Sequence, residues 1–219
     1  MIDKIISFGD SFIFGTDLAD SDSKRKYSKS TWPALCAKEL GLDYECHAQG
    51  ARGNHYISLE AMAKSCTNTL VIINWSWIDR FDYYPTERPI VPRTVLPGID
   101  NELSEFYYKN FHSEAGDLFR SLSTIYATHS YLKEQNIPFV SSIMDTLLVT
   151  DIWNKVNPIP NLQEVIQKDI SWFPNQQTFL EWSRSNGYPE SKGWHPLEQA
   201  HAEAVKVWLP TYKSMISSE

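Results

Sequence analysis

The chain has 219 residues, of which 42% are hydrophobic, and its formal net charge is −7. This length suffices for one domain with a proper core, and the acidic balance argues against the basic footprint of a nucleic-acid-binding protein. No apolar run is long enough to span a membrane. Because no basic and apolar leader precedes the first apolar stretch, we expect a cytoplasmic protein without a signal peptide.

Strands and helices are expected to alternate along the chain. The strands are expected over residues 2–8, 43–48, 70–73 and 137–144. The helices are expected over residues 31–41, 54–65, 103–135 (broken near Gly116), 162–168, 176–185 and 196–216. For the first of these helices, Ser30 or Thr31 can cap the start, Pro33 fits the first turn and Gly41 can end it. The alternation predicts an α/β fold, a three-layer α/β/α sandwich around a mostly parallel sheet.

Residues 79–102 interrupt this alternation. The segment carries four prolines and is expected to form a long excursion from a single domain that spans residues 1–219. Connections of this length are usually functional or mobile. We expect the excursion to overhang the site described next. The alternative is a surface loop that packs on a neighbouring helix or on a second subunit.

Two short motifs near opposite ends of the chain carry the chemistry. Gly9-Asp10-Ser11 follows the first expected strand, and His195-Pro196 precedes the last expected helix. A turn at the carboxyl end of the strand would place Ser11 at the sheet edge where ligands bind in open α/β folds. A serine hydroxyl is a poor nucleophile unless an adjacent base takes its proton, and His195 is the candidate base. The alternative is that Ser11 only caps a helix.

These motifs resemble a known family. Ile6–Phe12 looks like the first conserved block of the SGNH (GDSL-type) hydrolases, and Gly193–Pro196 looks like their last block. The resemblance implies a flavodoxin-like sandwich, with Ser11 as nucleophile and His195 as base. The segment Trp75–Arg80 is closer to divergent phage and bacterial members than to the usual third block.

The third member of a catalytic triad is missing from its usual place. The family has an aspartate three residues before the histidine, where this chain has Lys192. Such an acid orients the imidazole and stabilises its charged form. Either Ser11 and His195 act as a dyad oriented by a backbone carbonyl, or Glu190 or a distant acid such as Asp145 substitutes.

The oxyanion hole must aim hydrogen-bond donors at developing negative charge. The resemblance assigns one donor to the Ser11 amide and a second to a glycine of the segment 48–54. Gly50 has the better spacing to the next helix, and Gly53 is the alternative. For the third donor the sequence leaves Asn74 and Ser76 open.

Aromatic residues are abundant, with eight Trp and eleven Tyr. We expect Trp75, Trp77, Tyr83 and Arg88 to line a cleft suited to a sugar ring. Ordinary core and surface packing is the alternative. The three cysteines lack zinc-type spacing, and reduced, mostly buried thiols are expected. No histidine pair has metal-ligand spacing, so no metal and no cofactor are predicted.

The sequence therefore predicts a serine ester hydrolase that removes an acyl group, such as acetyl, from a carbohydrate. Its partner would be a small-molecule or glycan ester, with no nucleic acid and no membrane; the oligomeric state stays open. One alternative is a catalytically silent carbohydrate- or protein-binding module on the same scaffold, which Lys192 favours. Another is a lipase or thioesterase. The presence of both Ser11 and His195 favours the enzyme.

Overall fold

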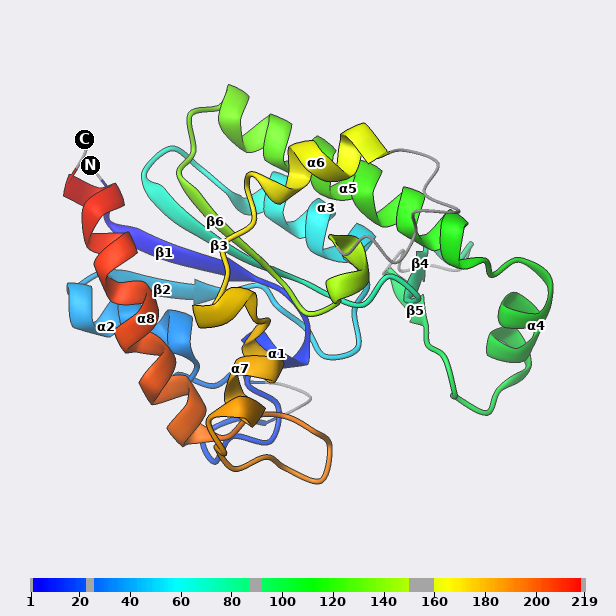
Figure 1. Ribbon diagram of the computed structural model, residues 1–219, viewed down its shortest axis with the longest axis horizontal. Helices are drawn as coiled ribbons and strands as arrows, with labels where there is room; N and C mark the ends of the chain where they lie inside the picture. Colours follow the sequence, from blue (N-terminus) through cyan, green and yellow to red (C-terminus); the bar gives the residue numbers. More distant parts are fainter. Residues whose placement is uncertain (1, 23–25, 87–91, 150–159, 218–219) are drawn as a thin grey trace.

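A parallel sheet of four strands forms the centre of the protein (Figure 1). The computed structural model describes residues 2–22, 26–86, 92–149 and 160–217. The strand order is β2–β1–β3–β6, with β1 at Lys4–Phe8, β2 at Asp43–Cys46, β3 at Thr69–Trp75 and β6 at Phe139–Ile143. All three strand pairings are parallel, so the carboxyl ends of these strands meet at one edge of the sheet.

Helices cover both faces of the sheet and complete three layers (Figure 1). One face carries α2 (Trp32–Leu40), α7 (Phe179–Ser185) and α8 (Glu198–Ser217), and the other carries α3 (Asn54–Lys64), α5 (Glu114–Glu134) and α6 (Pro160–Gln167). The predicted fold class is confirmed. None of the helices within the described ranges is both long enough and apolar enough to cross a membrane.

Alternation along the buried strands divides the core in two. In β1, Ile5 packs with the α2 and α8 layer, whereas Ile6 packs with the α3 and α5 layer. In β3, Ile72 and Ile73 alternate in the same way. Successive side chains of a strand point to opposite faces, so a sheet covered on both sides needs apolar residues at every position. Leu70–Ile73 of β3 is accordingly an unbroken apolar run, whereas β1 and β6 include buried serines and the edge strand β2 has a mixed sequence.

Local signals explain where most helices begin and end. Gly41 ends α2 in the left-handed conformation, with φ of 67°, as predicted. The expected helix over 103–135 is two helices, α4 (Glu102–Asn110) and α5. The break lies at residues 111–113 rather than at Gly116, because the Ser113 side chain accepts from the Gly116 amide and caps α5.

The start of α2 is capped from another helix. Thr31 occupies the N-cap position without a side-chain bond to the helix. Instead, the Trp32 amide donates to Nδ1 of the buried His201 on α8 at 3.1 Å. A helix amide that is buried without an acceptor costs free energy. The bond to His201 supplies this acceptor and joins α2 to α8. Burial lowers the pKa of His201 to about 3 and keeps its ring neutral.

A short helix, α1 (Ser11–Phe14), follows β1 directly, and its N-cap is Asp10 rather than Ser11. The described part of the excursion forms an antiparallel hairpin of β4 (Phe81–Tyr83) and β5 (Arg93–Val95). Figure 1 shows this hairpin near the start of α3 and apart from α1, and the predicted overhang of Ser11 stays a prediction. A 3₁₀ turn, η1 (Thr146–Leu148), follows β6, and another, η3 (Pro174–Gln176), precedes α7.

Candidate active site

Ser11 lies at the carboxyl edge of the sheet, as the first residue of α1. Asp10 is the N-cap, and its side chain accepts from the Phe12 amide at 3.0 Å. Gly15 ends the helix after four residues, with φ of 77° and its amide bonded to the Ser11 carbonyl at 3.0 Å. The turn is therefore short and closed at both ends. Ser11 is 8% exposed, at the surface of a buried motif.

Gly9 allows the turn to pack closely against β3. A Cβ at Gly9 would lie 2.7 Å from Cγ1 of Ile13 and 3.1 Å from the carbonyl oxygen of Asn74. The first distance is too short for any side chain without movement of the turn. Glycine at this position thus fixes where the turn leaves β1, and so where Ser11 stands.

His195 lies in the loop between α7 and α8 and reaches the turn that carries Ser11, which is the candidate nucleophile and gives this turn the name nucleophile turn. Its ring centroid lies 5.2 Å from that of Phe12, the residue after Ser11, in an edge-on arrangement. The histidine near the C-terminus and the serine near the N-terminus are thereby brought to the same edge of the sheet. His201, by contrast, faces the core, and its role is the helix contact described above.

Asp17 is the acidic partner of His195. Its Oδ2 lies 2.7 Å from Nδ1 of His195, and because an ionised carboxylate only accepts, the histidine donates. The same oxygen accepts from the Ser191 hydroxyl at 2.6 Å. These bonds, first from Ser191 and then from His195, hold the pKa of Asp17 below its ordinary value. An ionised Asp17 fixes the tautomer in which Nε2 of His195 is free to accept a proton.

Ser191 also shapes the histidine loop. Its hydroxyl oxygen accepts from the amides of Gly193 at 3.0 Å and of His195 at 3.3 Å. Its own amide donates to the His195 carbonyl at 2.9 Å. The loop is thus held by one side chain that also binds Asp17.

The acids proposed from the sequence have other partners. Glu190 accepts from the Arg184 guanidinium at 2.9 and 3.2 Å. Asp145 accepts from the amides of Ile78 and Leu147, both at 3.0 Å, and caps the turn after β6. Neither Glu190 nor Asp145 is therefore the acid bonded to His195, and the carboxylate at this histidine comes from another residue distant in the chain, Asp17. Asp17 carries no motif signal, but its position six residues after Ser11 could have drawn attention to it.

Asp10 anchors the turn from below. Its side chain is fully buried and forms an ion pair with Arg80, with Nη1 at 3.0 Å from Oδ2. The Ser76 hydroxyl donates to the same oxygen at 3.0 Å. The Arg80 guanidinium also lies over the Trp77 ring, 4.6 Å from its centroid. The residues after β3 therefore hold the carboxylate next to Ser11.

Of the oxyanion candidates, Gly50 lies beside Ser11. A Cβ at Gly50 would be 3.9 Å from Cβ of Ser11. The amide of Gly53 donates to Asp82 and is occupied. Asn74 and Ser76 are both buried, and among the described residues the side-chain amide nitrogen of Asn74 has no hydrogen-bond partner. The Ser76 hydroxyl is bonded to Asp10, and Oδ1 of Asn74 accepts from Ser142 at 2.8 Å.

The predicted aromatic cleft is only partly supported. Trp75 is fully buried in β3 and donates to the Ser141 hydroxyl at 2.8 Å, so it is a core residue and not a cleft residue. Trp77 is half-buried, and its ring lies 5.7 Å from that of Phe12. Tyr83 lies in β4, on the hairpin apart from α1. Arg88 lies outside the described residues.

An exposed tryptophan stands next to His195. Trp194 is 67% exposed and has φ of 66°, in the left-handed region that costs a bulky residue energy. The guanidinium of Arg184 covers its ring at 5.2 Å. Strained residues cluster at functional sites, where the surroundings enforce them. Trp194 therefore joins Trp77 as a candidate substrate contact.

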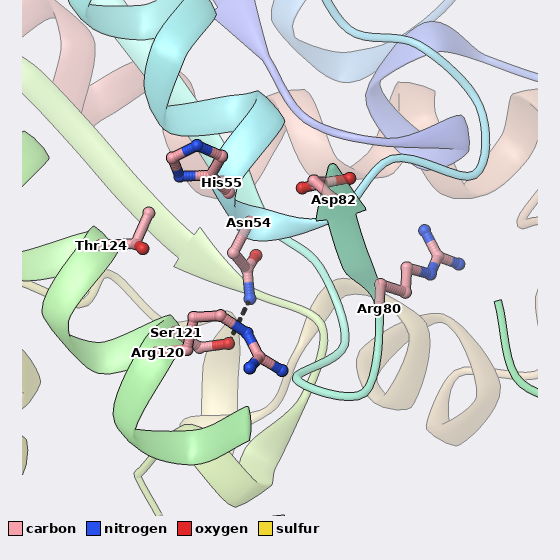
Figure 2. Close-up of a pocket in the computed structure, with 7 residues that line it drawn as sticks. All are labelled: Asn54, His55, Arg80, Asp82, Arg120, Ser121 and Thr124. Carbon is pink, nitrogen blue, oxygen red and sulfur yellow. Dashed lines mark hydrogen bonds between the residues drawn. The ribbon is translucent and has the colours of Figure 1, made fainter. Parts of the chain in front are cut away.

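A cavity of about 260 Å³ lies between α3, α5 and the start of β4 (Figure 2). It is lined by Asn54, His55, Arg80, Asp82, Arg120, Ser121 and Thr124. The Asn54 amide nitrogen donates to the Ser121 hydroxyl at 3.2 Å and to the Ser76 carbonyl at 3.1 Å, which braces the chain after β3. Neither Ser11 nor His195 lines this cavity, so we assign it no substrate. Within the described ranges, no three His, Cys, Asp or Glu side chains are grouped to hold a metal ion.

Comparison with known proteins supports the fold. No family model and no curated protein matches the sequence. Among solved structures, an acetyl xylan esterase from Butyrivibrio proteoclasticus matches with a TM-score of 0.51 and 12% identity, over 98% of this chain and 64% of that one. A carbohydrate esterase family 2 enzyme from Corynascus, with a carbohydrate-binding domain, matches with a TM-score of 0.54 and 14% identity, over 98% and 66%.

A third similar structure has the same length as this chain. The esterase EstA from Pseudoalteromonas, solved with monoethylphosphonate as inhibitor, matches with a TM-score of 0.51 and 8% identity, over 98% of this chain and 99% of that one. The chain thus shares the α/β fold of these three esterases and spans about two thirds of the two carbohydrate esterases. At these identities the likeness concerns the fold.

Proposed function

We propose that this protein is a serine ester hydrolase in which Ser11, His195 and Asp17 form the catalytic triad. The observation that carries the proposal is the 2.7 Å bond from His195 to Asp17, beside the turn that presents Ser11. In a silent module nothing would require a carboxylate on Nδ1 of this histidine. Lys192 stands where the family has its aspartate, and this favoured the silent module. In our proposal, Asp17 supplies the carboxylate instead.

The reaction follows from these roles. His195 takes the proton of Ser11 as its hydroxyl attacks the ester carbonyl, and the amides of Ser11 and Gly50 would stabilise the oxyanion. The oxyanion collapses, and the alcohol leaves with the proton from His195. Water then attacks the acyl-enzyme while His195 takes its proton, and His195 returns that proton to Oγ of Ser11 as the carboxylic acid is released. Asp17 stabilises the imidazolium in each step.

The substrate we propose is an acylated, for example acetylated, carbohydrate. Trp77 lies against Phe12 of the turn that carries Ser11, and Trp194 is exposed and precedes His195 in the chain; aromatic side chains of this kind suit the apolar side of a sugar ring. The acetyl xylan esterase and the carbohydrate esterase family 2 enzyme share the fold, which agrees with this class.

A phosphonate ester probe tests the function directly. The Pseudoalteromonas esterase was solved with a phosphonate inhibitor, and the same chemistry should label Ser11 here. We expect hydrolysis of nitrophenyl acetate, loss of that activity on labelling, and a modified peptide that contains Ser11. A protein that neither hydrolyses the ester nor reacts with the probe would contradict the proposal and favour the alternative, a catalytically silent binding module.

A further inference from the structure

The segment that carries Gly50 is held in a strained conformation. Ala51 has φ of 64°, in the left-handed region that costs a non-glycine residue energy. Such a conformation persists only where its surroundings enforce it. The contacts of residues 49–53, here called the donor loop, show which groups do so.

The donor loop is closed on itself and fixed at its start. The Gln49 amide donates to the Gly9 carbonyl at 3.2 Å, which ties the loop to the end of β1. The Arg52 side chain reaches back, with Nε and Nη2 at 2.9 and 2.8 Å from Oε1 of Gln49. Gly50 and Ala51 are therefore enclosed between two bonded residues.

Arg80 fixes the end of the donor loop to the nucleophile turn. Its Nη1 donates to the Arg52 carbonyl at 3.1 Å and to Oδ2 of Asp10 at 3.0 Å. Asp10 is fully buried and precedes Ser11 in the chain. One guanidinium thus connects the carboxylate beside the nucleophile to the backbone two residues after Gly50.

Asp82 makes a second tie. Its Oδ1 accepts from the Gly53 amide at 3.0 Å and its Oδ2 from the Tyr56 amide at 2.8 Å. Gly53 is the N-cap of α3 and has no side chain to cap it, so Asp82 supplies the cap from β4. A Cβ at Gly53 would lie 2.7 Å from the Asp82 carboxylate. Thr94 of β5 donates to Oδ1 of Asp82 at 2.5 Å and holds this side chain in place.

We propose that Arg80 is a positioning residue that holds the Gly50 amide toward the oxyanion, with Asp82 of the β4–β5 hairpin as the second tie. The proposal rests on the proposed function of the same site. Donors for an oxyanion act through their fixed orientation, and a displacement of about 1 Å costs roughly 100-fold in rate. The hairpin of the Pro-rich excursion would therefore act on the reaction from outside the cleft.

Arg80→Ala, compared with Arg120→Ala, tests this role. The two arginines are matched, because Arg120 also pairs with a buried carboxylate, that of Asp117 on α5. Figure 2 shows them on different elements around the same cavity, and Arg120 bonds to Tyr107 and Asp117 rather than to the donor loop. With nitrophenyl acetate we expect Arg80→Ala to lose roughly 100-fold in kcat with KM changed less than about threefold. Arg120→Ala should keep kcat within about twofold.

Rescue distinguishes positioning from general damage. Guanidinium ion at millimolar concentration should restore part of the kcat of Arg80→Ala and none of any loss in Arg120→Ala. If Arg80→Ala does not fold, Arg80→Lys keeps a charge for Asp10 and loses the planar fork that also reaches Arg52. That variant should still lose roughly tenfold in kcat. Asp82→Asn replaces one of the two accepting oxygens of this side chain and should also lower kcat.

The proposal is overturned if Arg80→Ala and Arg80→Lys keep the wild-type kcat, or if both arginine-to-alanine variants lose kcat equally without rescue. A wild-type protein that fails to hydrolyse the ester or to react with the phosphonate would instead overturn the proposed function. The two failures are therefore distinguished by the wild-type protein alone.

Discussion

The Asp17 carboxylate accepts a 2.7 Å hydrogen bond from Nδ1 of His195, although 178 residues separate the two in the chain. Asp17 comes from the segment just after α1, and His195 comes from the loop before α8. Asp17 has φ of 72°, an uncommon conformation outside glycine, which aspartate tolerates better than most residues. The strained backbone turns this carboxylate toward the histidine loop.

Asp17→Asn is expected to lower kcat for nitrophenyl acetate by roughly 100- to 10,000-fold. A neutral amide does not stabilise the imidazolium, and it can bind either tautomer of His195. The fold should persist, since the Asp17 side chain is 41% exposed. Steady-state kinetics and thermal unfolding of the same samples check both statements. A variant with wild-type kcat would show that Asp17 is not the third member.

Lys192→Asp is the matched test of the family position. Because Asp17 already occupies Nδ1 of His195, we expect kcat within about twofold of the wild type. Lys192 is exposed, so the fold should tolerate the change. A gain of tenfold or more would mean that His195 lacks a carboxylate partner in solution.

Ser11→Ala and His195→Ala should each lower kcat by roughly a thousandfold or more, and the double variant should be little worse than either. The two side chains act as one unit, because the base has no proton to take without the nucleophile. Comparison of the three variants at equal enzyme concentration measures this. Losses that multiply would indicate independent roles and contradict the proposed pair.

Trp194→Ala should raise KM for an acetylated oligosaccharide by roughly tenfold and leave nitrophenyl acetate hydrolysis unchanged. A tenfold change corresponds to about 1.4 kcal/mol, a reasonable worth for one aromatic contact. Phe111→Ala is the control, since Phe111 is equally exposed, at 67%, and directly follows α4. Equal effects of the two variants, or of Trp194→Ala on both substrates, would remove Trp194 from the substrate site.

Acid should destabilise the fold through its buried histidines. Burial lowers the pKa of His201 to about 3 and that of His129 to about 4. Below pH 6.5 the unfolded chain takes up protons that the folded state does not, so the free energy of unfolding should fall as the pH drops from 6.5 towards 4. Each such histidine contributes a slope of up to about 1.4 kcal/mol per pH unit.

His201→Gln removes the contribution of one of these two histidines to the pH dependence of stability. Its Oε1 can accept from the Trp32 amide in place of Nδ1, and it does not titrate. Urea unfolding at pH 7, 5.5 and 4.5 should show a shallower loss of stability than in the wild type. An unchanged slope would mean that His201 is protonated in the folded state or is not the group that titrates.

Much of the fold could be predicted from the sequence. Buried parallel strands need apolar side chains on both faces, so Leu70–Ile73 was readable as a strand without knowledge of its neighbours. Helix ends carry local signals, and Gly41 ended α2 as expected. The break that was predicted near Gly116 lies a few residues earlier, because Ser113 caps the start of α5. The β4–β5 hairpin was not predicted, because neither of its short strands is an apolar run.

The candidate site likewise has residues that the sequence could predict and residues that it could not. Ser11 follows the end of a strand, and His195 precedes the start of a helix. Residues adjacent in the sequence specify this local backbone, so the sequence by itself determined both residues as candidates. Asp17, Arg80 and Asp82, in contrast, are candidates only because they contact residues that are distant in the chain. A side-chain bond of this kind depends on where two loops meet in space, and no local pattern specifies that meeting. Only the tertiary structure decided that Asp17 faces His195, that Ser76 and Asn74 are buried, and that Trp75 belongs to the core.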